Sequence, residues 1–252
     1  MNLHIYKSKE ELGEALAAWM CDLVKSTLKN QEFFTLVLSG GETPKILFKI
    51  LASAKFKDKI NWNRVHIFWG DERVVPFNDE RNNAKMAFAI LIDNIDIPGN
   101  QVHIMRTNIE PIFAAQEYEK MLHNFFANTT KSFDLVLLGM GDDGHTLSLF
   151  PGSDTIEEIN ENENWVHTVY NELQQMFRIT LMPVIVNRAS HIVFMVEGAK
   201  KANTLKDVLE GKYKPDQLPA QRIKPAKGEL HWFLDEAVAK ELSKPYEKEQ
   251  KK

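Results

Sequence analysis

Residues 133–145, FDLVLLGMGDDGH, join an apolar run to a glycine-rich turn. A continuous apolar run that leads directly into glycines is typical of a buried strand in a parallel sheet and of the loop at its carboxyl end. The start of the turn, residues 139–144, fits the pattern G-x-G-x-x-G of dinucleotide-binding folds. His145 comes next, and Asp143 stands two positions before it. The stretch therefore predicts either a cofactor loop or a site of acid–base chemistry.

The same alternation of strand, loop and helix continues on both sides of this stretch. Apolar runs predict strands at residues 3–7, 33–38, 64–69, 101–105, 133–138, 165–170, 177–182, 191–196 and 229–235. Helical spacing predicts helices at 8–28, 44–51, 83–92 and 111–127, a loop and helix over 197–211, and a short helix after 235. Ser8 and Glu11 fit a capping box at the first helix. Such alternation predicts an α/β fold with a Rossmann-like, open, mostly parallel sheet covered by helices on both faces.

Composition limits the classes of protein to consider. The hydrophobic fraction of 44% is ordinary for a globular chain, and the formal net charge of −4 argues against broad binding to nucleic acid or anionic membranes. Cys21 is the only cysteine, so no disulfide framework or zinc cluster can form from cysteines. The first residues lack the apolar core of a signal peptide, and no apolar run is long enough to span a membrane. We predict a cytoplasmic protein with one domain over residues 1–243 and a frayed tail over 244–252.

Four polar loops follow predicted strands. They are 39–45 (SGGETPK), 70–76 (GDERVVP), 139–152 (GMGDDGHTLSLFPG) and 197–202 (EGAKKA). In open α/β sheets, ligands bind beyond the carboxyl ends of the strands. We therefore expect the four loops to converge on one binding site.

The first two loops each allow a functional and a structural interpretation. In 39–45, Gly40 and Gly41 permit a tight turn, and N–H groups at a helix start can bind an anion, with Thr43 as a further donor. The alternative is a plain turn with Pro44 at the first helical position. Glu42 would repel a phosphate, so it must point outward if the site is real.

In the second loop, Asp71 is a candidate for handling protons or orienting the substrate. Arg73 is a candidate bidentate hydrogen-bond donor to a phosphate or to a developing oxyanion. The alternative interpretation of residues 71–73 is a solvated cluster of charges.

The third loop fits a dinucleotide site poorly. That motif needs a helix directly after the glycines, whereas Pro151 and Gly152 break any long helix here. Asp142 and Asp143 would also face the pyrophosphate. A histidine beside an aspartate fits an acid or base better, because the aspartate can fix the tautomer of His145.

Three further cations are candidate anion ligands. Lys200 and Lys201 stand at a predicted helix start and are otherwise two solvated lysines. Arg178 lies within an apolar strand, where it must find a partner, and that partner can be purely structural.

Together these segments resemble the 6-phosphogluconolactonase family, within the larger group that includes glucosamine-6-phosphate deaminase and ribose-5-phosphate isomerase. The resemblance runs from about residue 33 to 240 and rests most on GMGDDGHTLSLFPG, which is similar to the family's G-x-G-x-D-G-H-x-A-S-L-F-P-G. LSGGETP, GDERVVP with Asn83, RITL and GAKK follow the family's order. Small departures occur at Glu42, at Asn82, which can still cap a helix, and at Leu147.

The resemblance implies hydrolysis of 6-phosphoglucono-1,5-lactone in the pentose phosphate pathway, without a metal or other cofactor. It assigns His145 as general base, Asp143 and Asp71 as orienting groups, and Arg73 to the oxyanion or the phosphate. The phosphate ligands it implies are Ser39, Gly40, Gly41, Thr43, Lys201 and Arg178. Lys201 rather than Lys200 matches the family's G-x-x-K spacing. The implied partner is a small sugar phosphate, and the implied assembly is a monomer or small homo-oligomer.

Three alternatives stay open at this point. A glucosamine-6-phosphate deaminase would share the loops but carries a glutamate before the proline, where this chain has Phe150. It also has a tyrosine or similar residue at the position of Arg73. A non-catalytic sugar-phosphate sensor usually carries a DNA-binding segment, and no basic helix-turn-helix module precedes residue 33. A dinucleotide-binding module is the third.

Overall fold

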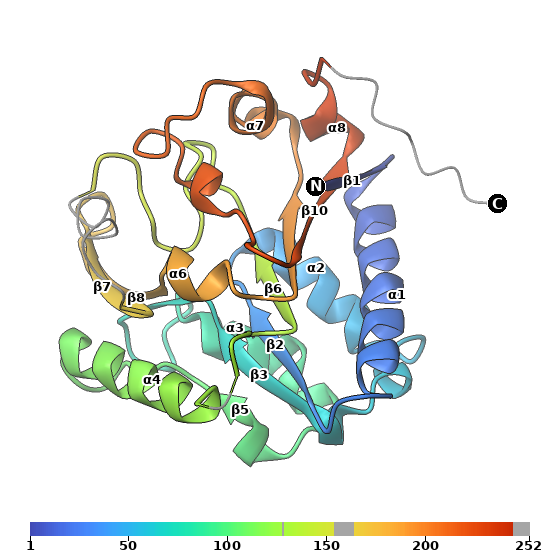
Figure 1. Cartoon of the computed structure of the whole chain (residues 1–252), viewed down its shortest axis with the longest axis vertical. Coiled ribbons are helices and arrows are strands. Elements are labelled where there is room, and N and C mark those ends of the chain that lie inside the picture. Colours follow the sequence, from blue (N-terminus) through green and yellow to red (C-terminus); the bar gives the residue numbers. More distant parts are fainter. Residues whose placement is uncertain (128, 154–163, 244–252) are drawn as a thin grey trace.

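The computed structural model of the chain describes residues 1–127, 129–153 and 164–243 (Figure 1). The predicted tail, 244–252, lies outside these residues, so the proposed domain boundaries stay predictions.

The described residues form a seven-stranded sheet in which all neighbouring strands run parallel. Its order is β1 (Asn2–Tyr6), β10 (Glu229–Asp235), β9 (His191–Val196), β6 (Leu135–Leu138), β2 (Phe34–Leu38), β3 (Val65–Trp69) and β5 (Val102–His103). From β2 the chain proceeds to β3 and β5 on one side, whereas β6, β9 and β10 lie on the other side. The carboxyl ends of β2 and β6 therefore meet where the strand order reverses, which is the usual ligand position in such sheets.

Helices cover both faces of the sheet, as predicted (Figure 1). One face packs against α1 (Lys9–Thr27), α2 (Glu42–Leu51) and α3 (Asn83–Ile90), and the other against α4 (Pro111–Phe125), α6 (Pro183–Val186), α7 (Ala202–Glu210) and α8 (Glu236–Ala239). Strand β2 shows why both faces are apolar. Leu36 and Leu38 point into the first core, and Val37 between them points into the second. Continuous apolar runs in the sequence follow directly from this double burial.

Two predicted caps are present at helix starts. The Oγ of Ser8 accepts a hydrogen bond from the N–H of Glu11 at 3.2 Å, and the Oδ1 of Asn82 accepts one from the N–H of Lys85 at 2.8 Å. These side chains occupy backbone donors that have no partner within the helix.

A second, antiparallel sheet is not predicted by the sequence. It consists of β4 (Asp71–Arg73), β8 (Met176–Leu181) and β7 (Val166–Asn171), in that order. The expectation that residues 71–73 belong to a loop is therefore wrong. Their strand character comes from pairing with β8, in which Arg73 lies opposite Arg178. No pattern within so short and charged a segment indicates that pairing.

Several element boundaries also differ from the predictions. Helix α2 begins at Glu42 rather than Pro44, because Gly41 adopts φ 102° and takes the N-cap position. Strand β6 begins at Leu135 rather than residue 133. Before it, the Oδ2 of Asp134 accepts bonds from the backbone N–H (2.8 Å) and hydroxyl (2.9 Å) of Thr35 on β2, which takes the place of regular ladder pairing.

Candidate functional site

The four predicted loops meet in one pocket of about 260 Å³ at the carboxyl edge of the sheet. Of the predicted site residues, those that line it are Ser39, Gly40, Gly41, Thr43, Asp71, Arg73, His145, Arg178 and Lys201. Asp143 stands behind His145 and borders a neighbouring hollow of about 550 Å³, which shares Phe150 with the pocket. The structure thus brings the predicted residues together at the switch point between β2 and β6.

His145 and Asp143 form a short hydrogen bond. The Nδ1 of His145 lies 2.6 Å from the Oδ1 of Asp143, which also accepts the backbone N–H of His145 at 3.1 Å. The hydrogen bond from His145 lowers the pKa of Asp143, so this carboxyl group is an anion at neutral pH. Because a carboxylate can only accept, Nδ1 carries the proton in the neutral ring. Nε2 is then left as the basic nitrogen of a half-buried ring at the pocket wall.

The loop that carries His145 is shaped by its glycines. A Cβ at Gly141 would lie 2.1 Å from the Nδ1 of His145, so only glycine lets the ring lie against this backbone. Gly144 has φ 81°, and Leu147 adopts the left-handed region with φ 55°. No helix begins within residues 139–153. The N–H groups that would bind a pyrophosphate are therefore not presented, which argues against the dinucleotide alternative.

Asp71 and Arg178 form a buried ion pair in the floor of the pocket. The Nη1 of Arg178 donates to the Oδ2 of Asp71 at 3.3 Å, and the side chains are 5% and 8% exposed. Burial lowers the pKa of Arg178, whereas the charge of Asp71 raises it. Two residues that the sequence analysis missed complete this network. The hydroxyl of Ser148 donates to Asp71 at 2.6 Å, and the Oε1 of Gln174 accepts from Arg178 at 2.5 Å.

Arg73 and Arg178 place two positive charges on the same side of the small sheet. They are direct partners across β4 and β8, and both line the pocket. Like charges in this position repel one another. The guanidinium of Arg73 also donates to the carbonyl of Arg81 at 2.7 Å. The buried Nε atoms of Arg73 and Arg178 make no hydrogen bond to any described residue. An anion in the pocket would relieve the repulsion.

Phe150 lies against both Arg178 and His145. Its ring centroid lies 4.8 Å from that of His145, and the guanidinium carbon of Arg178 lies 5.4 Å from the same ring. The sequence motif contains Phe150, but its contact with Arg178 depends on β8 and could not be read from the motif. Arg178 and His145 thus contact the same aromatic ring.

The loop after β2 presents the amino end of α2 to the pocket. Residues 39–44 line it, and the N-cap Gly41 contributes no side-chain cap to this end of the helix. Glu42 borders the pocket, but its side chain is 82% exposed and pairs with Lys45 at 2.5 Å, as the site requires. The hydroxyl of Thr43 lies 3.4 Å from the Oε1 of Glu197, a partner that the sequence analysis did not identify.

The two adjacent lysines differ in position. Lys201 is half-buried, takes the N-cap position of α7 and lines the pocket, whereas Lys200 is exposed and lies outside it. The loop before them is fixed by Asp235, whose carboxylate accepts the N–H of Gly198 at 3.1 Å. The geometry thus agrees with the choice of Lys201 over Lys200.

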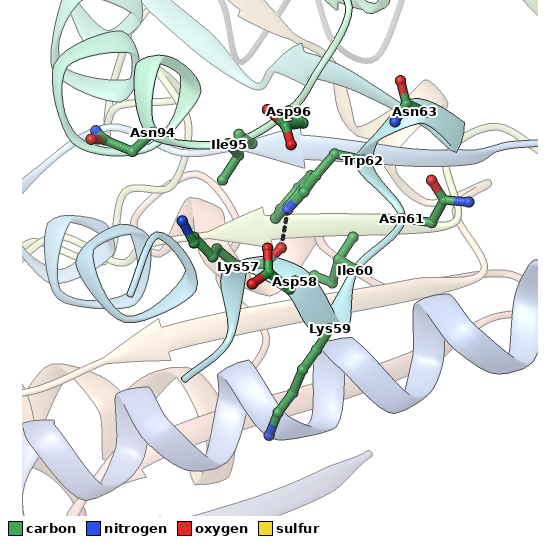
Figure 2. A pocket seen from close by; sticks show the side chains of 10 residues that line it. All are labelled: Lys57, Asp58, Lys59, Ile60, Asn61, Trp62, Asn63, Asn94, Ile95 and Asp96. Carbon is green, nitrogen blue, oxygen red and sulfur yellow. Dashed lines mark hydrogen bonds between the residues drawn. The ribbon is translucent and has the colours of Figure 1, made fainter. Parts of the chain in front are cut away.

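Another hollow, of about 420 Å³, lies at the opposite, amino end of the strands (Figure 2). It is lined by residues 57–63, which precede β3, and 94–96, which precede β5. The indole of Trp62 is buried there and donates to the carbonyl of Lys57 at 2.8 Å. This hollow contains none of the predicted site residues.

In the part of the chain that the structure describes, no three histidine, cysteine, aspartate or glutamate side chains are arranged to hold a metal ion. None of its helices combines the length and apolar character needed to cross a membrane.

Proteins of similar sequence and structure show which family the chain belongs to. Residues 7–232 match the family described as glucosamine-6-phosphate isomerases/6-phosphogluconolactonase. A 6-phosphogluconolactonase from Synechocystis sp. is 40% identical over 212 residues (82% of this chain and 84% of that protein), and one from Nostoc sp. is 38% identical over 237 residues (91% and 95%). The structure of 6-phosphogluconolactonase from Trypanosoma brucei superposes with a TM-score of 0.83 at 25% identity, covering 96% of this chain and 98% of that one. The chain belongs to the family of glucosamine-6-phosphate isomerases and 6-phosphogluconolactonases.

Proposed function

We propose that the protein hydrolyses 6-phosphoglucono-1,5-lactone to 6-phosphogluconate. The observation that carries this proposal is the His145–Asp143 pair, which supplies a base at the wall of a pocket lined by Arg73, Arg178 and Lys201. Family members with the lactonase name, at 38–40% identity, support the same activity. The proposal includes a role in the pentose phosphate pathway and a cytoplasmic location. A monomeric or small homo-oligomeric state without a nucleic-acid partner stays a prediction.

The proposed reaction needs one base and a site for negative charge. His145 Nε2 takes a proton from water as the water oxygen attacks the lactone carbonyl carbon, and the carbonyl oxygen becomes anionic. We assign Arg178, which contacts the same Phe150 ring as His145, to this oxygen rather than to the phosphate. The C–O bond to the ring oxygen then breaks, and His145 returns the proton to this leaving oxygen. Asp143 keeps the ring in the required tautomer throughout.

We assign the substrate's phosphate to the other side of the pocket. The amino end of α2 offers backbone N–H groups, and Lys201 and Arg73 offer positive charge. Thr43 can add its hydroxyl when a phosphate oxygen competes with Glu197. In this assignment the phosphate holds the substrate and takes no part in bond breaking.

The test of the function is a direct assay. The lactone is generated in situ from glucose 6-phosphate, and its disappearance is followed against a blank, because this lactone also opens without a catalyst. We expect enzyme-dependent hydrolysis, and a kcat/KM for unphosphorylated gluconolactone at least roughly 100-fold lower, since two or more charge-assisted bonds are lost. Equal kcat/KM values for the two lactones would contradict the role of the phosphate.

Glucosamine 6-phosphate separates the proposal from its nearest rival. A deaminase must open an aminated sugar ring and move a proton between carbons, which takes several matched acid–base groups. Here Phe150, packed on His145, occupies the position of the rival's extra carboxylate. We expect no enzyme-dependent release of ammonia or fructose 6-phosphate. Release of both at a rate comparable to lactone hydrolysis would overturn the lactonase assignment.

Substitution of the two lysines tests the phosphate assignment. Lys201→Ala is expected to raise KM for the phosphorylated lactone roughly tenfold or more, because a hydrogen bond from a charged group is lost. Lys200→Ala is the matched control, since it removes the same charge one residue outside the pocket. It should change KM by less than about twofold, the size of a screened surface effect. Equal effects of the two substitutions would remove Lys201 from the site.

A further inference from the structure

Asn83 lies between two loops of the site without lining the pocket. It is the first residue of α3, is 2% exposed, and its Nδ2 donates to the backbone carbonyl of Asp71 at 2.9 Å. On its other side it touches Gly40, where an added Cβ would lie 2.0 Å from the Oδ1 of Asn83. One amide group therefore contacts both the loop after β2 and strand β4.

Glu72 holds Asn83 in this place. Its side chain is fully buried and accepts three backbone N–H bonds, from Asn83 at 2.7 Å, from Ala84 at 2.8 Å and from Arg73 at 2.8 Å. The pKa of Glu72 is raised to about 7, because the effect of burial exceeds the lowering by the three N–H groups. The carboxylate is thus formed above neutral pH. It joins the first turn of α3 to the backbone of β4.

These contacts control a spacing that the proposed chemistry needs. The loop 39–43 belongs to the phosphate side of the pocket, and Asp71 anchors Arg178 on the reacting side. The distance between loop 39–43 and Arg178 decides whether one substrate molecule can contact both. Displacement of a binding group by about 1 Å can cost up to roughly 100-fold in rate.

We propose that Asn83 is a positioning residue that sets the spacing between the phosphate-binding loop 39–43 and strand β4, and that Glu72 fixes it there. This inference rests on the proposed function for its choice of substrate. The Asn83 amide is not part of the pocket lining. Its effect reaches the substrate through Gly40, so it concerns binding of the phosphate more than the chemical step.

The experiment is a double-substitution cycle between Asn83 and Gly40. Asn83→Ala and Gly40→Ala are each expected to weaken binding of 6-phosphogluconate roughly tenfold and to raise KM equally, while Asn83→Ala changes kcat by less than about threefold. The backbone of Gly40 is outside the positive-φ region, and the three atoms nearest to an alanine Cβ there all belong to the side chain of Asn83. In the double variant that clash is gone. It should therefore bind no more weakly than Asn83→Ala alone.

Binding is measured by calorimetry at about pH 8, where the Glu72 carboxylate is formed. The measured affinity for 6-phosphogluconate does not depend on catalytic turnover. If the wild-type protein binds 6-phosphogluconate but fails to hydrolyse the lactone, the proposed function fails and the cycle still decides this inference. Asn83→Ser is made in parallel and should show the same pattern with a smaller effect, so the test does not depend on one variant folding.

Asn82→Ala is the matched control for a merely structural role. It removes a helix cap at the neighbouring position and should lower the melting temperature, but should leave KM and the preference for the phosphorylated lactone unchanged. Two results would overturn the proposal. One is an effect of Asn82→Ala on KM equal to that of Asn83→Ala. The other is a double variant in which the two losses of affinity simply multiply.

Discussion

Replacing His145 by alanine is expected to lower kcat by roughly 10²–10⁴-fold, the usual contribution of general acid–base catalysis. The reason is its bond to Asp143, which leaves Nε2 as the base at the pocket wall. KM should change little, because the ring acts mainly in the transition state. The measurement is the loss of lactone generated in situ, compared with the uncatalysed rate.

Two further variants make this result specific. Asp143→Asn keeps the shape of the side chain bonded to His145, but the amide is neutral and can also donate a hydrogen bond. The tautomer of His145 is then no longer fixed, so kcat should fall while KM stays close to the wild-type value. His123→Ala removes a histidine on α4 that stacks on Trp165, away from the pocket, and should leave kcat unchanged. A folded His145→Ala variant with near-wild-type turnover would remove His145 from the mechanism.

Arg178→Met is expected to lower the free energy of unfolding by about 3–5 kcal/mol, the usual cost of leaving a buried charge without its partner. Methionine fills similar volume, so the main change is that Asp71 keeps only the hydroxyl of Ser148. Turnover should fall by at least roughly 100-fold as well, because the positive charge at the carbonyl oxygen is lost. Urea unfolding and the lactone assay at a temperature well below the transition measure the two effects separately.

The combination with Asp71→Asn distinguishes stability from chemistry. The amide that replaces the carboxylate in the double variant is neutral and can still accept from Ser148, so much of the lost stability should return. Turnover should stay low, because the guanidinium assigned to the carbonyl oxygen is absent. Full recovery of activity in the double variant would show that Arg178 only balances Asp71. Unchanged stability of Arg178→Met alone would show that the buried pair contributes nothing measurable.

Local patterns were sufficient to predict the central sheet. Strands such as β2 and β9 are buried on both faces, and this makes their sequences continuously apolar. The small sheet was missed because its evidence is not local. Asp71 and Arg178 are 107 positions apart, and nothing in GDER shows that it pairs with RITL. Similarly, Gly41 moved the start of α2 through its φ of 102°, although Pro44 suggested a later start.

The site was predictable where function needs a particular residue type in a loop. His145, Asp143, Arg73 and Lys201 stand after predicted strands, and the topology brings those strand ends together. Ser148 and Gln174 were given no role, because each is an ordinary polar residue whose role comes only from its neighbours in space. Asn83 was noted only as part of the family motif, because its contacts with Asp71 and Gly40 depend on the fold. A residue that acts only by positioning its neighbours has no recognisable sequence pattern of its own.

Strand β1 has a single neighbour in the central sheet, and that neighbour is β10. His4 and His231, which contact one another across this pair, are 227 positions apart in the chain. Closing so long a loop adds only modestly to the free-energy cost of folding, because the loss of chain entropy on loop closure grows with the logarithm of loop length. It delays folding more strongly, since topologies rich in distant contacts fold slowly. During synthesis β1 leaves the ribosome long before β10 is made, so the pairing of these two strands can form only after nearly the whole described chain exists.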